Sequence, residues 1–193
     1  MKKTILLSSL LLLSNSSLMA MQTNSSWFGG IDIGISKVSA IGNAGINTIE
    51  LESSSLYEGL KFGKKFDSSR VYFNYNYYNS DQNSELNSFG LTYDFLIKED
   101  APFIPFLGLN LSYQQYEEKG LTTDYNKKSL DVSGLSYGIN IGALYTINKN
   151  IDLELGTKIN KLTGSDDVTY LSNNAEIDAD LAIHSYLSVN YNF

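Results

Sequence analysis

The sequence has no cysteine, so disulfide bonds, thiolate metal sites and anchoring through a lipid-modified cysteine are excluded. A single histidine also excludes a metal site built from several imidazoles. Lysine and arginine number 14 against 21 acidic residues, a net charge of −7 at pH 7. They form no basic cluster, so no nucleic-acid partner is expected. An apolar content of 42% is ordinary for a soluble protein and excludes a bundle of transmembrane helices.

Aromatic residues and glycine are plentiful, whereas proline is rare. The 193 residues include 14 Tyr, 9 Phe and 15 Gly but only 2 Pro. This composition favours many short strands over helices, and the length suits one domain with a sizeable core. A membrane-spanning barrel stays open at this apolar content, because only half of each barrel strand has to be apolar.

Residues 1–20 read as a secretory signal peptide. Lys2 and Lys3 form the positive start, 5–13 is the apolar stretch, and Ala20 is a small residue suited to cleavage. The apolar stretch is too short for a helix that crosses a bilayer of about 30 Å. We therefore expect an exported chain, with a signal peptide over 1–20 and one barrel domain over 21–193.

The last stretch, 177–193, alternates strictly. Leu181, Ile183, Leu187, Val189, Tyr191 and Phe193 fall in one row, and His184, Tyr186, Ser188, Asn190 and Asn192 fall in the other. Side chains alternate across a strand, so one face is apolar and aromatic and the other is small or polar. This is typical of a strand whose outer face meets lipid and whose inner face meets a polar lumen.

Similar alternation recurs along the chain. Strands are predicted over 26–36, 56–66, 71–78, 86–97, 103–116, 130–147, 151–162 and 177–193. Connections after the second, fourth and sixth strands are short. Those after the first, fifth and seventh are long and polar. We interpret 37–55 as a surface loop, into which Ile46, Ile49 and Leu51 allow the strands to extend, and 67–70 as a tight turn. The pattern predicts an all-β fold, a closed antiparallel eight-stranded transmembrane up-and-down β-barrel, with short turns in the periplasm.

Aromatic residues are expected to gather where the bilayer ends. Near the periplasmic rim we expect Trp27, Phe66, Phe95, Phe103, Tyr145, Tyr191 and Phe193, and near the outer rim Tyr77, Tyr113 and Tyr137.

The closing strand and the repeated pattern resemble the small eight-stranded outer-membrane barrels of the OmpA and OmpX type. The resemblance implies that Leu187, Val189, Tyr191 and Phe193 form a C-terminal signal read by the barrel-assembly machinery. It implies both termini in the periplasm and, as partners, outer-membrane lipid and lipopolysaccharide. Members of that family serve as surface contacts, envelope-stabilising proteins or narrow pores, and no catalytic signature or cofactor carries over.

Charged residues at inward positions form the candidate site. They are Asp32, Lys61, Asp94, Glu154 and Lys158, with His184 as a neighbouring lumen residue. An eight-stranded barrel is only wide enough for side chains to fill it, and buried charges must be paired. We therefore predict a plugged lumen held by ion pairs, with a narrow ion path as the alternative.

Single residues bear on other possible functions. A lipid-modifying barrel enzyme would need a nucleophile beside His184, but Ser185 faces the other way and Ser188 lies about 13 Å along the strand. The acids Asp166, Asp167, Asp178, Glu117 and Glu118 match no calcium loop and are interpreted as solvated charge. We expect a non-enzymatic barrel with a structural or surface-interaction role, its loops binding a host or cell-surface ligand. A secreted soluble barrel that binds a small apolar ligand is the alternative architecture.

Overall fold

The computed structural model describes residues 25–44, 47–80, 84–97, 102–119, 129–163, 165–170 and 173–193. All regular elements in these ranges are strands. They are β1 (Ser26–Ala44), β2 (Asn47–Lys65), β3 (Ser69–Ser80), β4 (Ser84–Leu96), β5 (Phe103–Lys119), β6 (Ser129–Thr146), β7 (Ile151–Leu162), β8 (Ser165–Tyr170) and β9 (Asn173–Asn192). No helix in the described ranges is long and apolar enough to cross a bilayer.

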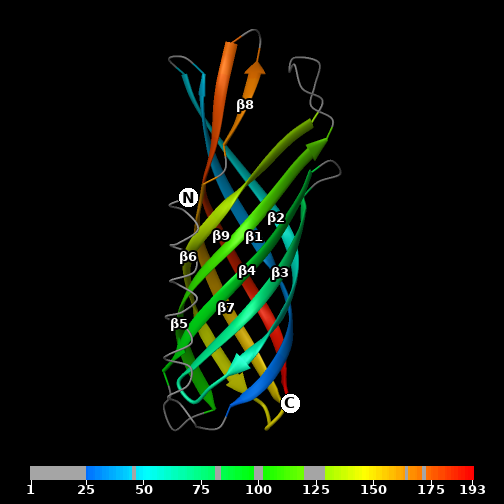
Figure 1. Ribbon diagram of the computed structural model, residues 1–193, viewed down its shortest axis with the longest axis vertical. Helices are drawn as coiled ribbons and strands as arrows, with labels where there is room; N and C mark the ends of the chain where they lie inside the picture. The colour runs from blue at the N-terminus through cyan, green and yellow to red at the C-terminus, as the bar shows by residue number, and fades with distance from the viewer. Residues whose placement is uncertain are drawn as a thin grey trace, which may run out of the picture.

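The strands form a closed antiparallel barrel (Figure 1). Strands β1 to β7 follow chain order around the wall, and β9 pairs with both β7 and β1. Strand β8 pairs with the first part of β9, from Tyr170↔Asn173 to Ser165↔Asp178, on the same edge of β9 as β7, and continues the β7 position beyond the end of that strand. The wall is therefore the predicted eight-stranded barrel, made of β1 to β7 and β9. The Phe193 N–H donates to the Trp27 carbonyl at 2.9 Å and holds the closing seam at its end.

The register of the ladders fixes the width of the barrel. Cross-strand partners lead from Gly29 through Phe62, Phe73, Leu91, Leu111, Tyr137, Lys161 and Leu181 back to β1 at Ser39, ten residues beyond the start. With ordinary strand spacings, eight strands and a shear of ten give a tilt of roughly 40° and a backbone radius of roughly 8 Å. An interior of this size is filled by side chains.

The apolar rows face outward. Ile31, Phe73 and Leu109 are 62%, 70% and 66% exposed, whereas Asp32, Thr92 and Asn140 on the opposite rows are 0% exposed. A soluble barrel with an apolar interior would show the reverse, so the alternative architecture is wrong. The outward rows suit contact with lipid acyl chains, and the inward rows form a polar lumen.

The outward surface has an apolar band bounded at both ends. We call the end that holds the short turns and Phe193 the turn end, and the opposite end the loop end. Projected onto the barrel axis, Tyr77, Tyr113 and Tyr137 lie within about 2 Å of one level, roughly 21–23 Å above Trp27. Outward polar residues follow just beyond these three tyrosines: Lys37, Asn87 and Lys161. The band is thus roughly 25 Å tall, the height expected for a barrel in an outer membrane.

An aromatic rim lies at the turn end. Trp27 stacks on Phe62 with ring centroids 5.3 Å apart, and Phe62 stacks on Phe193 at 6.2 Å. Most of the rim aromatics predicted from the sequence are exposed here: Trp27, Phe95, Phe103, Tyr145, Tyr191 and Phe193. Phe66, directly after the last residue of β2, also lies at this end, since the Lys64 ammonium is 5.5 Å from its ring and 5.8 Å from the Trp27 ring, but it is only 9% exposed.

Two predicted polar loops contain strands in the structure. Within 37–55, β1 and β2 extend beyond the wall, as the sequence allowed, and form a hairpin up to the pair Ala44↔Asn47. Part of the polar range before 177 also forms β8 and the start of β9, which was not predicted. Backbone hydrogen bonds continue a ladder where apolar alternation is weak, so the pattern in the sequence ends before the strands do. A register shift between Ser39 and Ala40 marks the change from wall to hairpin.

Inward glycines make room for large neighbours. A Cβ on Gly156 would lie 2.5 Å from the ring and hydroxyl of Tyr186 on the adjacent strand. Gly142 bears the same relation to Phe106, whose ring would be 2.6 Å from a Cβ there. Small residues on one strand therefore let aromatic side chains of the next reach across the narrow lumen.

The apolar band predicts a depth-dependent penalty for charge on the outward face. Leu109→Arg lies near the middle of the band and should destabilise the folded barrel by about 2–4 kcal/mol, because an arginine there faces hydrocarbon. The matched control is Gln115→Arg on the outward row of the same strand beyond the band, with an expected change of about 0–1 kcal/mol. Urea titration of reversible folding into phospholipid vesicles measures both, and equal changes would place the band elsewhere.

Candidate functional site: the charged lumen

The lumen is organised around the carboxylate of Glu154 on β7. Arg70 of β3 reaches across the barrel and binds it with both terminal nitrogens, Nη1 to Oε2 at 2.8 Å and Nη2 to Oε1 at 2.8 Å. Lys61 of β2 donates to Oε2 at 2.8 Å. All three residues are at most 4% exposed. A carboxylate held by a bidentate guanidinium and an ammonium is among the stronger arrangements for buried charge.

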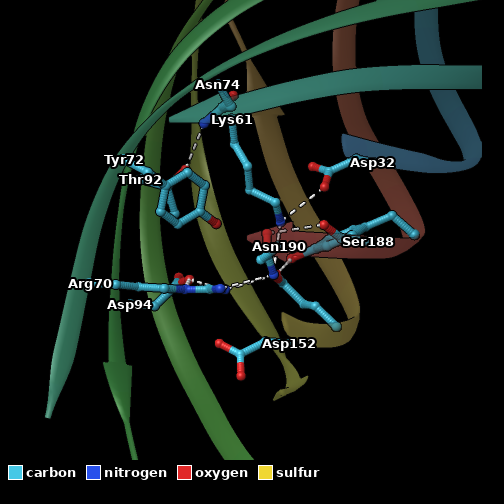
Figure 2. A network of polar contacts seen from close by, with 12 residues as sticks. Asp32, Lys61, Arg70, Tyr72, Asn74, Thr92, Asp94, Asp152, Ser188 and Asn190 are labelled. Carbon is cyan, nitrogen blue, oxygen red and sulfur yellow. Dashed lines mark hydrogen bonds and ion pairs between the residues drawn. The ribbon is translucent and has the colours of Figure 1, made fainter. Parts of the chain in front are cut away.

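Further polar groups complete this network (Figure 2). Arg70 also pairs with Asp94 at 2.6 Å, and Lys61 pairs with Asp32 at 2.9 Å. Asn190 Nδ2 and the Tyr186 hydroxyl each donate to Glu154 at 2.8 Å. Both Glu154 oxygens are therefore multiply hydrogen-bonded. Each long cation is shared between two carboxylates, which holds opposite walls of the barrel together.

A second ion pair and an apolar layer lie closer to the turn end. Lys65 binds Asp152 at 2.6 Å, and Asp152 also accepts hydrogen bonds from Thr146 at 2.8 Å and Asn192 at 3.0 Å. An apolar cluster of Leu96, Phe106 and Leu144, each 1% exposed, fills the lumen beside them. The Arg70 guanidinium lies 4.7 Å from the centroid of the Phe106 ring. Charge, aromatic rings and aliphatic side chains together fill this half of the barrel.

Charges in the described lumen balance. The acids are Asp32, Asp94, Asp152 and Glu154, and the bases are Lys61, Lys65, Arg70 and Lys158. Because an uncompensated buried charge is very unfavourable, equal numbers of acids and bases stabilise the lumen.

Sequence-predicted residues fall into two groups. Asp32, Lys61, Asp94 and Glu154 meet in the Glu154 network. Lys158 and His184 are cross-strand partners nearer the loop end. Lys158 lies over the Tyr186 ring at 5.2 Å, and His184 packs on Tyr78 with centroids 5.1 Å apart.

Arg70 is the functional residue that the sequence reading missed. It was assigned to a tight turn over 67–70, but the turn is shorter and β3 begins at Ser69. Arg70 lies two residues before Tyr72, on the same inward row. Extending the alternation backwards by one step would have placed it in the lumen.

The residues around His184 include one serine that the sequence did not suggest. Ser36 of β1 is its cross-strand partner, but neither Ser36 Oγ nor the His184 nitrogens have a hydrogen-bond partner within the protein. Ser185 faces outward and shares a hydrogen bond with Thr157 at 3.2 Å, and Ser188 lies 3.3 Å from Asn190 Oδ1. No serine–histidine hydrogen bond exists among the described side chains.

In the described part of the chain, no three His, Asp or Glu side chains lie close enough together to bind a metal ion. The side chains considered for calcium lie outside the described ones: Glu117, Glu118, Asp166, Asp167 and Asp178. The residues of the predicted assembly signal form an outward row of β9, with Leu187, Val189, Tyr191 and Phe193 58%, 53%, 54% and 61% exposed.

Comparison with known proteins agrees with this geometry. A family model described as "Opacity family porin protein" matches residues 62–184. The chain belongs to the Opacity family of porin proteins. No curated protein sequence matches it.

Solved structures of other outer-membrane proteins have the same fold as this Opacity family barrel. Neisserial surface protein A matches with a TM-score of 0.62 at 15% identity, over 88% of this chain and 99% of the other. The outer membrane protein OprG from Pseudomonas aeruginosa matches with a TM-score of 0.59 at 12% identity, over 90% and 99%. Family and fold together make the protein an integral outer-membrane β-barrel, as predicted.

Because Glu154 is at the centre of its network, replacing it should strongly destabilise this Opacity family barrel. Glu154→Gln should destabilise the barrel by about 3–5 kcal/mol, because Arg70 and Lys61 lose a shared buried counter-charge. The control on the same strand and face is Asp152→Asn, expected to cost about 1 kcal/mol, because its partner Lys65 is partly exposed and can turn to water.

A double-mutant cycle isolates the pair. Arg70→Met combined with Glu154→Gln should lose less free energy of unfolding than the sum of the single changes. Urea titration in phospholipid vesicles measures all the variants, and additive changes would contradict a direct interaction across the lumen.

Proposed function

We propose that this barrel is a non-enzymatic surface protein whose lumen does not conduct and whose loop-end hairpins make its contacts. The observation that carries the proposal is the filled lumen, with the paired Glu154 network and the apolar cluster below it. A barrel whose interior is occupied by its own paired charges serves as a rigid support. Any specific contact then belongs to the segments beyond the membrane.

The filled lumen argues against a pore. The Arg70 guanidinium, bound by the carboxylates of Asp94 and Glu154, lies across a barrel with a backbone radius of only roughly 8 Å. Opening a path would require breaking the Arg70–Glu154 and Lys61–Glu154 pairs in a low-dielectric interior, which is strongly unfavourable.

Paired hairpins support the surface role. Strand β1 continues seven residues past Lys37 to Ala44, which corresponds to roughly 23 Å of extended chain beyond the apolar band. Strand β9 begins at Asn173 and pairs there with β8. Figure 1 shows these hairpins rising above the rest of the wall at the loop end. Ordered hairpins present a larger and more rigid surface than short loops do.

We place the loop end outside the cell and the turn end in the periplasm. Short turns at one end and long connections at the other are the usual arrangement of outer-membrane barrels. In this reading residues 1–20 direct export, and Leu187, Val189, Tyr191 and Phe193 direct insertion by the barrel-assembly machinery. Outer-membrane lipid and lipopolysaccharide then surround the apolar band, and a host or cell-surface molecule binds the hairpins.

The catalytic alternative lacks its central contact. His184 and Ser36 are opposite one another, but they are not hydrogen-bonded and both face the lumen. A lipid-modifying enzyme would need an activated nucleophile where acyl chains can reach it.

A conductance measurement tests the closed lumen. The purified, folded barrel in planar bilayers should give no current steps, because paired charges fill its interior, while a general porin recorded in the same bilayers gives steps. Reproducible steps from folded monomer would favour the narrow pore and refute the sealed lumen.

Hairpin trimming tests the surface role. Joining Ser39 to Glu52 by an Asn-Gly turn in place of 40–51 removes the end of the β1–β2 hairpin and keeps the paired wall. Bacteria that display the trimmed barrel should attach to cultured epithelial cells less than bacteria that display the full chain. Heat-dependent mobility in gels confirms that both are folded. A second variant that trims the β8–β9 hairpin shows which hairpin binds, and unchanged attachment in both would refute the proposed role.

A further inference from the structure

Buried polar atoms without a partner gather in one half of the lumen. Near or above the level of Lys158, several buried side chains have atoms without a hydrogen-bond partner in the protein. They include Ser36, Asn110, Gln114, Ser136, Asn160 and His184. By register these residues lie roughly 15–25 Å above Trp27, in the half nearer the loop end. The Glu154 network lies below them. Native proteins satisfy nearly all buried polar groups, so these atoms indicate bound water or a ligand.

The register places these groups on two lines of cross-strand partners that meet on β7. Ser36, His184 and Lys158 are successive partners across β1, β9 and β7. Asn110, Gly138 and Asn160 are successive partners across β5, β6 and β7. Gly138 has no side chain, and the Asn160 side-chain oxygen lies 2.5 Å from where a Cβ would be, so it packs over the glycine.

These side chains are shielded from bulk solvent. Ser136, His184 and Ser36 are 0%, 1% and 2% exposed, and Asn110 and Gln114 are 8% and 7% exposed. Their unpaired atoms therefore need partners inside the lumen.

Charge distinguishes this region from the network below. Lys158 is the one charged side chain among the described inward residues of this half, and it forms no ion pair there. Its ammonium lies over the Tyr186 ring at 5.2 Å. The lumen carboxylates lie nearer the turn end. Donors accompany the ammonium: the amide nitrogens Asn110 Nδ2 and Gln114 Nε2 and the hydroxyls of Ser36 and Ser136 have no protein acceptor.

We propose that the loop-end half of the lumen is a hydrated chamber that binds a small inorganic anion at Lys158. The chamber is bounded below by Tyr186 and the Glu154 network, so the anion enters from the loop end and leaves by the same way. An ammonium in the same half of the lumen as several unpaired N–H and O–H donors favours an anion over a cation. The carboxylates below limit how deep it sits.

Bromide is a suitable probe because it scatters anomalously and can replace chloride. Crystals of the full mature barrel grown with sodium bromide should show an anomalous peak within hydrogen-bonding reach of Lys158 Nζ. Lys158→Met should abolish this peak, and Lys158→Arg should keep it. Lys65→Met is the matched control: it removes a lysine paired with Asp152 at the other end of the lumen and should leave the peak unchanged.

A solution measurement separates binding from crystal concentration. Bromide titration of the detergent-solubilised barrel should shift the NMR signal of the Lys158 ε-methylene saturably, and the signal of Lys65 should not follow. No peak in the wild type, a peak that persists in Lys158→Met, or a shift that rises linearly with salt would each overturn the proposal. None of these results would bear on whether the barrel conducts, which the planar-bilayer recording tests. The anion site and the closed lumen can therefore be refuted independently.

Discussion

The hydrogen bonds between β1 and β9 are the constraint on which the rest of the molecule depends. A strand edge in hydrocarbon leaves unpaired N–H and C=O groups, each unfavourable by several kcal/mol, so the sheet has to close. Closure of eight strands with a shear of ten then fixes the radius. The radius in turn leaves an interior that only side chains can fill, and the chemistry of the lumen follows from that space.

The polar filling of the lumen follows from the outward rows. Since alternate positions on each strand face lipid, the remaining positions have to supply the whole interior, and in the described ranges they include charged residues from five of the eight wall strands. Glu154 gains its two cationic partners, Lys61 and Arg70, from strands that are not its neighbours in the wall. Lys61 and Arg70 therefore act as cross-struts between β7 and the opposite side. Removing either cation leaves a buried carboxylate without its partner. A shifted register would therefore lose free energy of folding through broken ion pairs as well as through broken backbone hydrogen bonds.

Alternation along the chain was enough to predict the wall. The strands around Phe73, Leu109 and Tyr191 repeat apolar and polar residues with a period of two. Their outward direction follows from a polar interior. The order of the strands follows from short turns such as that at Asn148, where the side-chain oxygen accepts hydrogen bonds from the backbone of Asn150 and Ile151. These signals are local and need no knowledge of the closed barrel.

Other features depend on information that is not local. The Lys61–Glu154 pair joins residues 93 positions apart, and their meeting depends on the shear, which no single strand encodes. Arg70 was missed because a charged residue beside a turn is usually solvated, and only closure buries it. The hairpin beyond Ser39 could be predicted only in outline, from Ile46, Ile49 and Leu51, because its exact register depends on backbone hydrogen bonds.

The two halves of the lumen divide different tasks between them. Toward the turn end, ion pairs, aromatic rings and aliphatic side chains pack densely and join opposite walls. Toward the loop end, polar atoms of Ser36, Gln114 and His184 lack hydrogen-bond partners within the protein.

The stacking of Trp27 on Phe62 has one practical consequence. The chain has a single tryptophan. It lies beside the seam, where its carbonyl accepts the hydrogen bond from Phe193 and its ring belongs to the aromatic rim. Its fluorescence therefore reports one event, the joining of the first and last strands at the bilayer surface. The kinetics of barrel closure can be followed in the unmodified protein without any introduced label.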